Sequence, residues 1–134
     1  MLLAARGSIS SASSIAQHLL QKAYSLPAYA EQKQAKFEIL QRRYQRIKEI
    51  LASHPEYAAS FQPMPFNSGY FMCVKPLGVE PEALRKHLLA TRGTGVIVLS
   101  GLIRLAFSAV PYAKLDALFE NIHVAIQELK TARS

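Results

Sequence analysis

Hydrophobic residues in the first quarter of the chain recur at helical spacing. Ile15, Leu19 and Ala23 follow one another every four residues, which places them on one face of a helix. Several serines precede this run, and a serine hydroxyl accepts hydrogen bonds from the free amides at a helix start. Pro27 marks the end of the pattern. The pattern therefore predicts a first helix that ends near residue 25.

A second and longer helix is predicted over residues 28–53, where His54 and Pro55 end it. Its apolar residues recur at spacings of three and four and form one stripe, which consists of Phe37, Leu40, Tyr44, Ile47 and Leu51. A helix of this kind gains most of its stability from packing its apolar face, so the stripe needs a partner surface. A coiled coil is the alternative interpretation, although the stripe covers only about two heptads.

Three short apolar runs in the second half of the chain predict strands. They cover residues 69–75, 96–99 and 102–108, and a tight Ser100-Gly101 connection predicts that the last two form a hairpin. The alternation of the third run places Ile103, Leu105 and Phe107 on one face and Arg104 on the other.

Helices are predicted on both sides of this hairpin, over residues 81–91 and 112–130. Residues 56–66 are predicted to be irregular because Pro63 and Pro65 disfavour regular structure. This order of elements predicts an α+β fold, in which helices pack on one small and mostly antiparallel sheet after a long linker helix. The expected division is an N-terminal helical part, residues 1–55, and an α+β domain, residues 56–134.

Composition is that of an ordinary globular chain: 134 residues, of which 50% are hydrophobic and 19% charged. The single cysteine, Cys73, excludes an internal disulfide and favours a reducing compartment, so we expect a cytoplasmic protein. Because Cys73 lies inside an apolar run, we expect a small buried hydrophobe rather than a reactive thiol.

No apolar stretch approaches the roughly 20 residues of a membrane helix. Residues 1–30 lack acidic side chains, as transit peptides do, but they run directly into a patterned helix.

The formal net charge of +7 raises the possibility of a nucleic-acid partner. The densest group of cations is Arg42, Arg43, Arg46 and Lys48, and glutamates lie among them. We interpret this group as a solvated helix face rather than a nucleic-acid patch. A basic α+β module that binds nucleic acid or a protein partner without catalysis is the alternative function.

Catalytic and metal-binding patterns are not evident in the sequence. The four histidines, His18, His54, His87 and His123, do not pair with each other or with the cysteine at metal-ligand spacing. Arg104 is the exception, because a charge inside an apolar strand is costly unless it is paired or reaches solvent. Its planar guanidinium either pairs with a glutamate, points into solvent, or grips a small carboxylate through two parallel hydrogen bonds.

Several segments resemble the C-terminal part of class I/II aminotransferases, which are pyridoxal-phosphate enzymes of fold type I. The resemblance rests on residues 65–71 (PFNSGYF), 94–98 (TGVIV) and 103–108 (IRLAFS). Residues 6–10 and the helix after them resemble the segment just beyond the cofactor lysine, and the long helix resembles the one that links the large and small domains. The resemblance covers nearly the whole chain.

This resemblance implies that Arg104 binds the α-carboxylate of an amino acid or 2-oxo acid during amino-group transfer. Asn67 is a second and weaker candidate for substrate binding, and Gly69 is more plausibly a close-packing position. The cofactor lysine, the aspartate on the pyridine nitrogen and the phosphate-binding residues all lie upstream in the family. Lys22 and Asp116 are in the wrong places for these roles. We therefore expect a small domain with its linker from a longer enzyme, which cannot hold pyridoxal phosphate covalently or transaminate alone.

Without a large domain, part of the apolar stripe on the long helix would be uncovered. Exposed apolar patches drive self-association, so we expect a homo-oligomer such as a homodimer, with swapped helices. A purely structural role, in which the long helix only mediates pairing, is a further alternative. The resemblance is compatible with transamination, lyase and decarboxylase chemistry, because one fold and one cofactor support several reactions.

Overall fold

The computed structural model describes residues 13–67 and 69–132, which form two compact units. The first unit ends at Glu38 and contains helix α2, Ser14–Tyr24, together with the beginning of helix α3, Ala28–Ser53. Both predicted helices are therefore present, and the long one has the predicted bounds. The side chain of Ser13 caps α2 by accepting a hydrogen bond from the backbone N–H of Ala16 at 3.3 Å.

The second unit begins at Ile39, so the last part of α3 belongs with the sheet. The expected boundary at residue 55 falls inside this unit. The apolar stripe of α3 is only partly covered, because Ile47 is fully buried in the core whereas Phe37 is 46% exposed. A polar residue at position 47 would consequently destabilise the unit itself, which argues against a role of this position in pairing alone.

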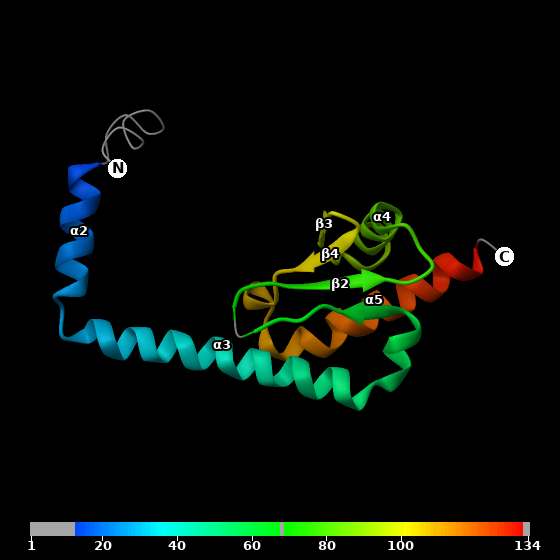
Figure 1. The fold of residues 1–134 in the computed structure, drawn as a ribbon, viewed down its shortest axis with the longest axis horizontal. Coiled ribbons are helices and arrows are strands. Elements are labelled where there is room, and N and C mark those ends of the chain that lie inside the picture. Colours follow the sequence, from blue (N-terminus) through cyan, green and yellow to red (C-terminus); the bar gives the residue numbers. More distant parts are fainter. Residues whose placement is uncertain (1–12, 68, 133–134) are drawn as a thin grey trace. The chain divides into compact units, whose positions relative to one another are not determined.

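The sheet of the second unit has four strands in the order β1-β2-β4-β3, and every neighbouring pair is antiparallel (Figure 1). Their bounds are Phe61–Pro63 for β1, Met72–Pro76 for β2, Ile97–Leu99 for β3 and Leu102–Leu105 for β4. The predicted hairpin is confirmed, since β3 pairs with β4 across Ser100 and Gly101. These two residues have φ angles of 50° and 78°, as a tight hairpin turn with two left-handed residues requires. The predicted α+β class with an antiparallel sheet is also confirmed.

Strand β1 corrects the prediction that residues 56–66 are irregular. Pro63 pairs with Val74 at the end of an edge strand, where a missing N–H interrupts no further ladder. A short 3-10 helix η1, Pro55–Ala59, precedes this strand. Two predicted strands were too long: β2 begins at Met72, and β4 gives way to a 3-10 turn η2, Phe107–Ala109.

Helices α4, Pro81–Arg92, and α5, Leu115–Thr131, complete the second unit, and α5 follows a 3-10 turn η3, Tyr112–Lys114. Glu80 caps α4 by accepting from the N–H of Ala83 at 2.7 Å. Side chains from α3, α4, α5 and the sheet form one core, whose largest fully buried members are Phe61, Phe107, Phe119, Ile47, Ile50, Met72, Leu84, Leu88, Ile103, Leu105, Leu115 and Ile122.

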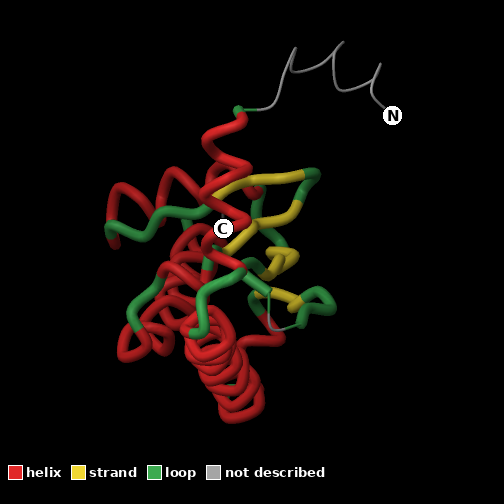
Figure 2. The backbone as a smooth tube through the Cα atoms, turned by 90° about the vertical axis from the view of Figure 1, so that its left-hand side faces the viewer, coloured by secondary structure: helices red, strands yellow, loops and turns green. Residues whose placement is uncertain are grey.

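The sheet buries one face against the helices and leaves the other uncovered. Met72, Val74, Ile103 and Leu105 alternate into the core, as predicted for β4. Figure 2 shows the strands on one side of this unit and its helices on the other. The opposite face carries large apolar side chains that remain half exposed, among them Ile97. We call this side the open face of the sheet; it consists of Gln62, Cys73, Lys75, Ile97, Leu99, Leu102 and Arg104.

Candidate functional site

Arg104 lies at the centre of the open face. It stands in the middle of β4, directly opposite Cys73 of β2 on one side and Ile97 of β3 on the other. Residues paired across antiparallel strands project to the same face, with Cβ atoms about 5 Å apart. The two inner neighbours of Arg104 in β4, Ile103 and Leu105, point into the core. The strand thus holds a guanidinium on the side that the helices do not cover.

The Arg104 guanidinium stacks on an aromatic ring instead of pairing with a carboxylate. Its Cζ atom lies 4.6 Å from the centroid of the Phe71 ring, a cation–π contact. Arg104 is in no ion pair among the residues that the structure describes, and its buried Nε atom has no hydrogen-bond partner there. The glutamate partner considered from the sequence is therefore not found in the described chain. Stacking uses the face of the guanidinium and leaves N–H groups at its edge for an acceptor.

An open hollow of about 600 Å³ lies beside this arginine. Phe71 belongs both to its wall and to the stack with Arg104. Its other lining residues include Met64, Phe66, Asn67, Cys73 and Leu102, and within the described chain no lining residue is charged. Arg104 is not itself a lining residue, but it contacts Phe71 and lies opposite Cys73, which both line the hollow. A cation next to an apolar wall is how a pocket for a small organic carboxylate is commonly built.

Asn67 lines the hollow, but its side chain also holds a turn. The Oδ1 atom of Asn67 accepts a hydrogen bond from the backbone N–H of Gly69 at 3.1 Å. This is a local Asx contact at the approach to β2. A Cβ atom on Gly69 would lie 3.2 Å from the same oxygen, so this glycine allows a close approach. The amide nitrogen of Asn67 remains for a ligand, and its substrate role stays a prediction.

Cys73 is less buried than its sequence environment suggested. It is a free, half-buried thiol, because it occupies the outward position between the buried Met72 and Val74. The greater exposure of Cys73 follows from the alternation of side chains along β2. When a sheet is covered on one side only, every second residue of an apolar strand still lies on the open face. Cys73 therefore forms part of the floor beside Arg104.

Three of the four clustered cations of α3, Arg42, Arg46 and Lys48, contact side chains of the second unit. Arg46 forms an ion pair with Asp116 of α5 at 2.7 Å and a second with Glu49 at 3.2 Å. Arg42 lies over the ring of Tyr112, with 5.0 Å between its Cζ atom and the ring centroid. These are the contacts of a solvated helix face, and they do not single out a nucleic-acid surface.

A polar cluster that the sequence did not reveal lies between η1 and α5. Ser60 is fully buried, and its Oγ atom accepts a hydrogen bond from Nε2 of Gln127 and bonds Nδ1 of His123, each at 2.8 Å. The serine and the histidine are 63 residues apart in the chain, and no local spacing indicates their meeting. A serine with no exposed surface cannot attack a substrate, so this cluster holds η1 against α5.

Two further histidines contact single carboxylates at the surface. His54 Nδ1 lies 2.7 Å from Glu56, and this hydrogen bond lowers the pKa of the glutamate. His87 Nε2 lies 2.7 Å from Glu128, whose pKa is lowered by this bond and by the guanidinium of Arg92. Within residues 13–67 and 69–132, no group of three histidine, cysteine, aspartate or glutamate side chains could hold a metal ion.

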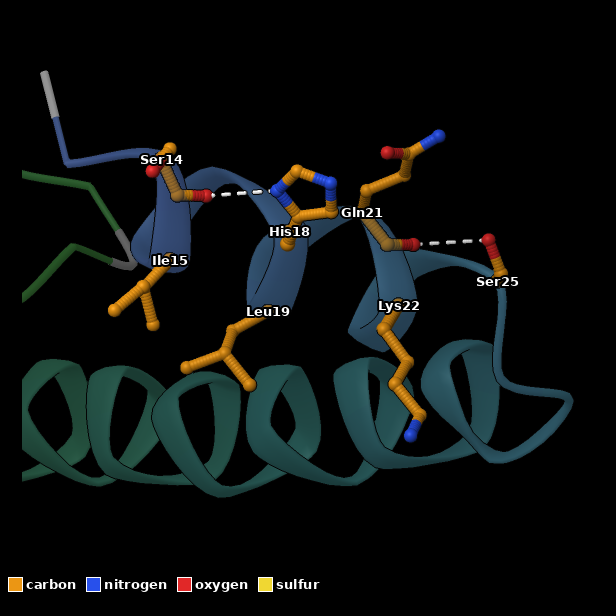
Figure 3. Close-up of a pocket in the computed structure, with 7 residues that line it drawn as sticks. All are labelled: Ser14, Ile15, His18, Leu19, Gln21, Lys22 and Ser25. Carbon is orange, nitrogen blue, oxygen red and sulfur yellow. Dashed lines mark hydrogen bonds between the residues drawn. The ribbon is translucent and has the colours of Figure 1, made fainter.

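Helix α2 carries another hollow, shown in Figure 3, of about 700 Å³. All its lining residues come from α2 and the residue after it, so it is a surface depression along one helix. Its polar groups bond the backbone of the same turn: His18 Nδ1 contacts the carbonyl of Ser14, and the Ser25 hydroxyl donates to the carbonyl of Gln21, both at 2.9 Å. These contacts are those of helix ends, and they do not converge on a ligand.

The residues around Arg104 do not fit covalent pyridoxal phosphate. That cofactor requires a lysine for its Schiff base and a charged partner for its ring nitrogen. Among the described residues, the hollow has neither a lysine nor an acid in its lining, and Asp116 is paired with Arg46. Lys22 lies on α2, in the first unit. The chemistry that this site can supply from its own residues is the binding of a carboxylate.

Comparison with known proteins provides no family assignment. No family model matches the chain, and no curated protein matches it. Over the described residues, none of the helices combines the length and apolar character needed to cross a membrane.

Proposed function

We propose that this chain is the linker helix and small domain of an aminotransferase-like pyridoxal-phosphate enzyme, and that Arg104 binds the α-carboxylate of its amino acid or 2-oxo acid. One observation carries the proposal: an arginine at the centre of the open face, stacked on Phe71 and without an ion-pair partner in the described chain. A guanidinium in this state has its edge available for two parallel hydrogen bonds to a carboxylate.

The role proposed for this chain is binding and orientation. When bound in the complete enzyme, the cofactor supplies the electron sink for amino-group transfer. Arg104 would fix one end of the substrate, and Phe71 would hold the guanidinium in place through the stack. A homodimer in the cytoplasm forms part of the same proposal, on the basis of the family resemblance and the single cysteine.

Carboxylate binding is testable on the chain itself. In a titration of ¹⁵N-labelled protein with pyruvate, we expect a saturable shift of the Arg104 Nε–Hε resonance, which the Arg104→Met spectrum assigns. Arg46 is the internal control, because its guanidinium is already paired with two carboxylates. An Arg104 resonance that stays fixed, or that moves no more than that of Arg46, would overturn the role of Arg104.

Membership in a longer enzyme is tested by the mass of the native protein. We expect an intact mass well above the 14.9 kDa of this sequence. In that enzyme, Arg104→Ala should raise the KM for the amino acid by at least about 100-fold, because losing a bidentate charged pair costs about 3 kcal/mol. A native mass near 14.9 kDa would contradict the enzyme part of the proposal.

A further inference from the structure

The wall of the hollow beside Arg104 is apolar over most of its extent. Apart from the amide of Asn67, its lining consists of methionine, proline, phenylalanine, cysteine and leucine side chains. Two of these are aromatic rings, Phe66 and Phe71. A ligand whose carboxylate lies on Arg104 would therefore place the rest of its body against hydrocarbon and ring surfaces.

Ring packing fixes the part of this wall that Phe66 forms. The Phe66 ring packs edge-on against Tyr44 of α3 and against Phe107, with centroid distances of 5.3 and 6.3 Å. Phe107 is fully buried in the core. Edge-to-face pairs of this kind hold rings in defined orientations. The wall is thus in place before a ligand arrives, which lowers the cost of binding.

Phe71 is the adaptable part of the wall. The residue is 49% exposed, and one side of its ring faces the guanidinium of Arg104. The exposed remainder of the ring is free to contact a ligand that the same guanidinium binds. Carboxylate and ring contacts therefore lie next to each other at the rim of the hollow.

A second negative charge finds no counterpart inside this hollow. Burying a carboxylate among apolar side chains without a cation is strongly unfavourable. Lys75, two positions from Cys73 along β2, is the only other cation among the strand residues of the open face, and it is exposed. Neither Lys75 nor Arg104 is a lining residue, and Arg104 is joined to the hollow through its contact with Phe71. The hollow thus offers contacts to an apolar ligand body and no cation to the second carboxylate of a dicarboxylate.

From this geometry we infer that the site takes a monocarboxylate with an apolar, preferably aromatic, side chain, in the form of an amino acid or its 2-oxo acid. The inference rests on the proposed function and narrows its substrate class. Covering about 60 Å² of a phenyl ring corresponds to roughly tenfold tighter binding. We therefore expect the affinities to fall in the order phenylpyruvate, pyruvate, 2-oxoglutarate.

Cys73 provides the readout, because it is the only cysteine of the chain and lies in the lining of the hollow. The rate of its alkylation by iodoacetamide, a neutral reagent, is measured by mass spectrometry against the concentration of each acid. Phenylpyruvate should give half-maximal protection at a concentration about tenfold below that of pyruvate. For 2-oxoglutarate we expect no tighter protection than for pyruvate.

Two variants assign the protection to the arginine. Arg104→Met keeps an apolar stem but removes the donors, so protection by pyruvate should disappear and protection by phenylpyruvate should require at least about tenfold more ligand. Lys75→Met removes the other cation of the open face and should change both values less than twofold. If Arg104→Met does not fold, as judged by circular dichroism, Arg104→Lys replaces it, because lysine keeps the charge without the bidentate fork.

The outcomes distinguish a wrong substrate class from the absence of carboxylate binding. If 2-oxoglutarate protects Cys73 as well as phenylpyruvate does, and protection still requires Arg104, the substrate class is overturned while carboxylate binding stands. If phenylpyruvate protects equally well in Arg104→Met, the acid binds through its ring alone and the inference is overturned. If no acid protects Cys73 and the Arg104 resonance does not shift, both the inferred substrate class and the proposed function are overturned.

Discussion

Ile47→Ala, compared with Ile39→Ala, tests whether the last part of α3 belongs to the core of the second unit. The two isoleucines lie eight residues apart on the same helix, and both occur in the second unit. Ile47 has no exposed surface, whereas Ile39 is 40% exposed. Because the chemical change is identical at both positions, the pair isolates the effect of burial.

The expected magnitudes differ several-fold. Replacing a fully buried isoleucine with alanine lowers the free energy of unfolding by about 2–5 kcal/mol, through lost transfer energy and the cavity that remains. At Ile39 we expect a loss within about 1 kcal/mol, since much of this side chain is in water and alanine has the higher helix propensity. One kcal/mol shifts the melting temperature of a domain of about 100 residues by roughly 4–8 °C, so Ile47→Ala should lower it by about 10 °C or more.

Urea denaturation followed by circular dichroism at 222 nm measures both variants, with the melting temperature as a second readout. The m value, which is the slope of the free energy of unfolding against urea concentration, should stay unchanged. Neither variant alters the surface that unfolding exposes by more than a few atoms. Equal losses in the two variants would refute the assignment of Ile47 to the core. So would a larger loss for Ile39→Ala, which would mean that a surface described as exposed is covered in solution.

Three further predictions concern the hairpin turn, a surface carboxylate and the apolar stripe of α3. Gly101→Ala should cost about 1 kcal/mol in urea denaturation, because φ is 78° there, while Gly95→Ala, whose φ is not positive, should be neutral. The lowered pKa of Glu128 means that its stabilising contribution is present above the unfolded value of about 4.3 and is lost as the pH falls through the folded pKa. Glu128→Gln should thus lower the melting temperature at pH 7 and lose this effect in acid. The predicted homo-oligomer should dissociate in light scattering on Phe37→Ser, at an exposed position of the α3 stripe, but not on Leu89→Ser; a monomeric parent protein would contradict it.

The positions of helices and strands could be predicted from the sequence where local residue patterns determine them. The long helix has the predicted bounds, because prolines at positions 27 and 55 flank one continuous helical pattern. The hairpin was predictable for the same reason, since Gly101 tolerates the left-handed conformation that a tight turn requires. Strand β1 was not, because its three residues include Pro63 and become a strand only by pairing with β2.

The face of Arg104 was predictable, but its contacts were not. Alternation along β4 placed the arginine opposite the buried Ile103 and Leu105. Its contact with Phe71 depends on how β2 pairs with β4, and this register places Arg104 opposite Cys73, 31 positions away in the chain. The Ser60–His123 contact was missed for the same reason. Spacing along the chain predicts which face of a helix or strand a residue lies on. The residues that it contacts depend on how distant elements pair in the folded protein.

The energetics of Arg104 add to the argument for a functional role. Arg43 and Arg92 also have a buried Nε atom without a hydrogen-bond partner in the described chain, but only Arg104 stands in the middle of the open face of the sheet. A buried guanidinium nitrogen without a hydrogen-bond partner costs about 1–3 kcal/mol. The stack on Phe71 offsets about 0.5–1 kcal/mol of this at a partly exposed site. Positions where a chain keeps an unfavourable group in an otherwise consistent fold are those where function is expected. The terminal nitrogens of the guanidinium remain for a bound carboxylate, and this is why Arg104 is the residue to test first.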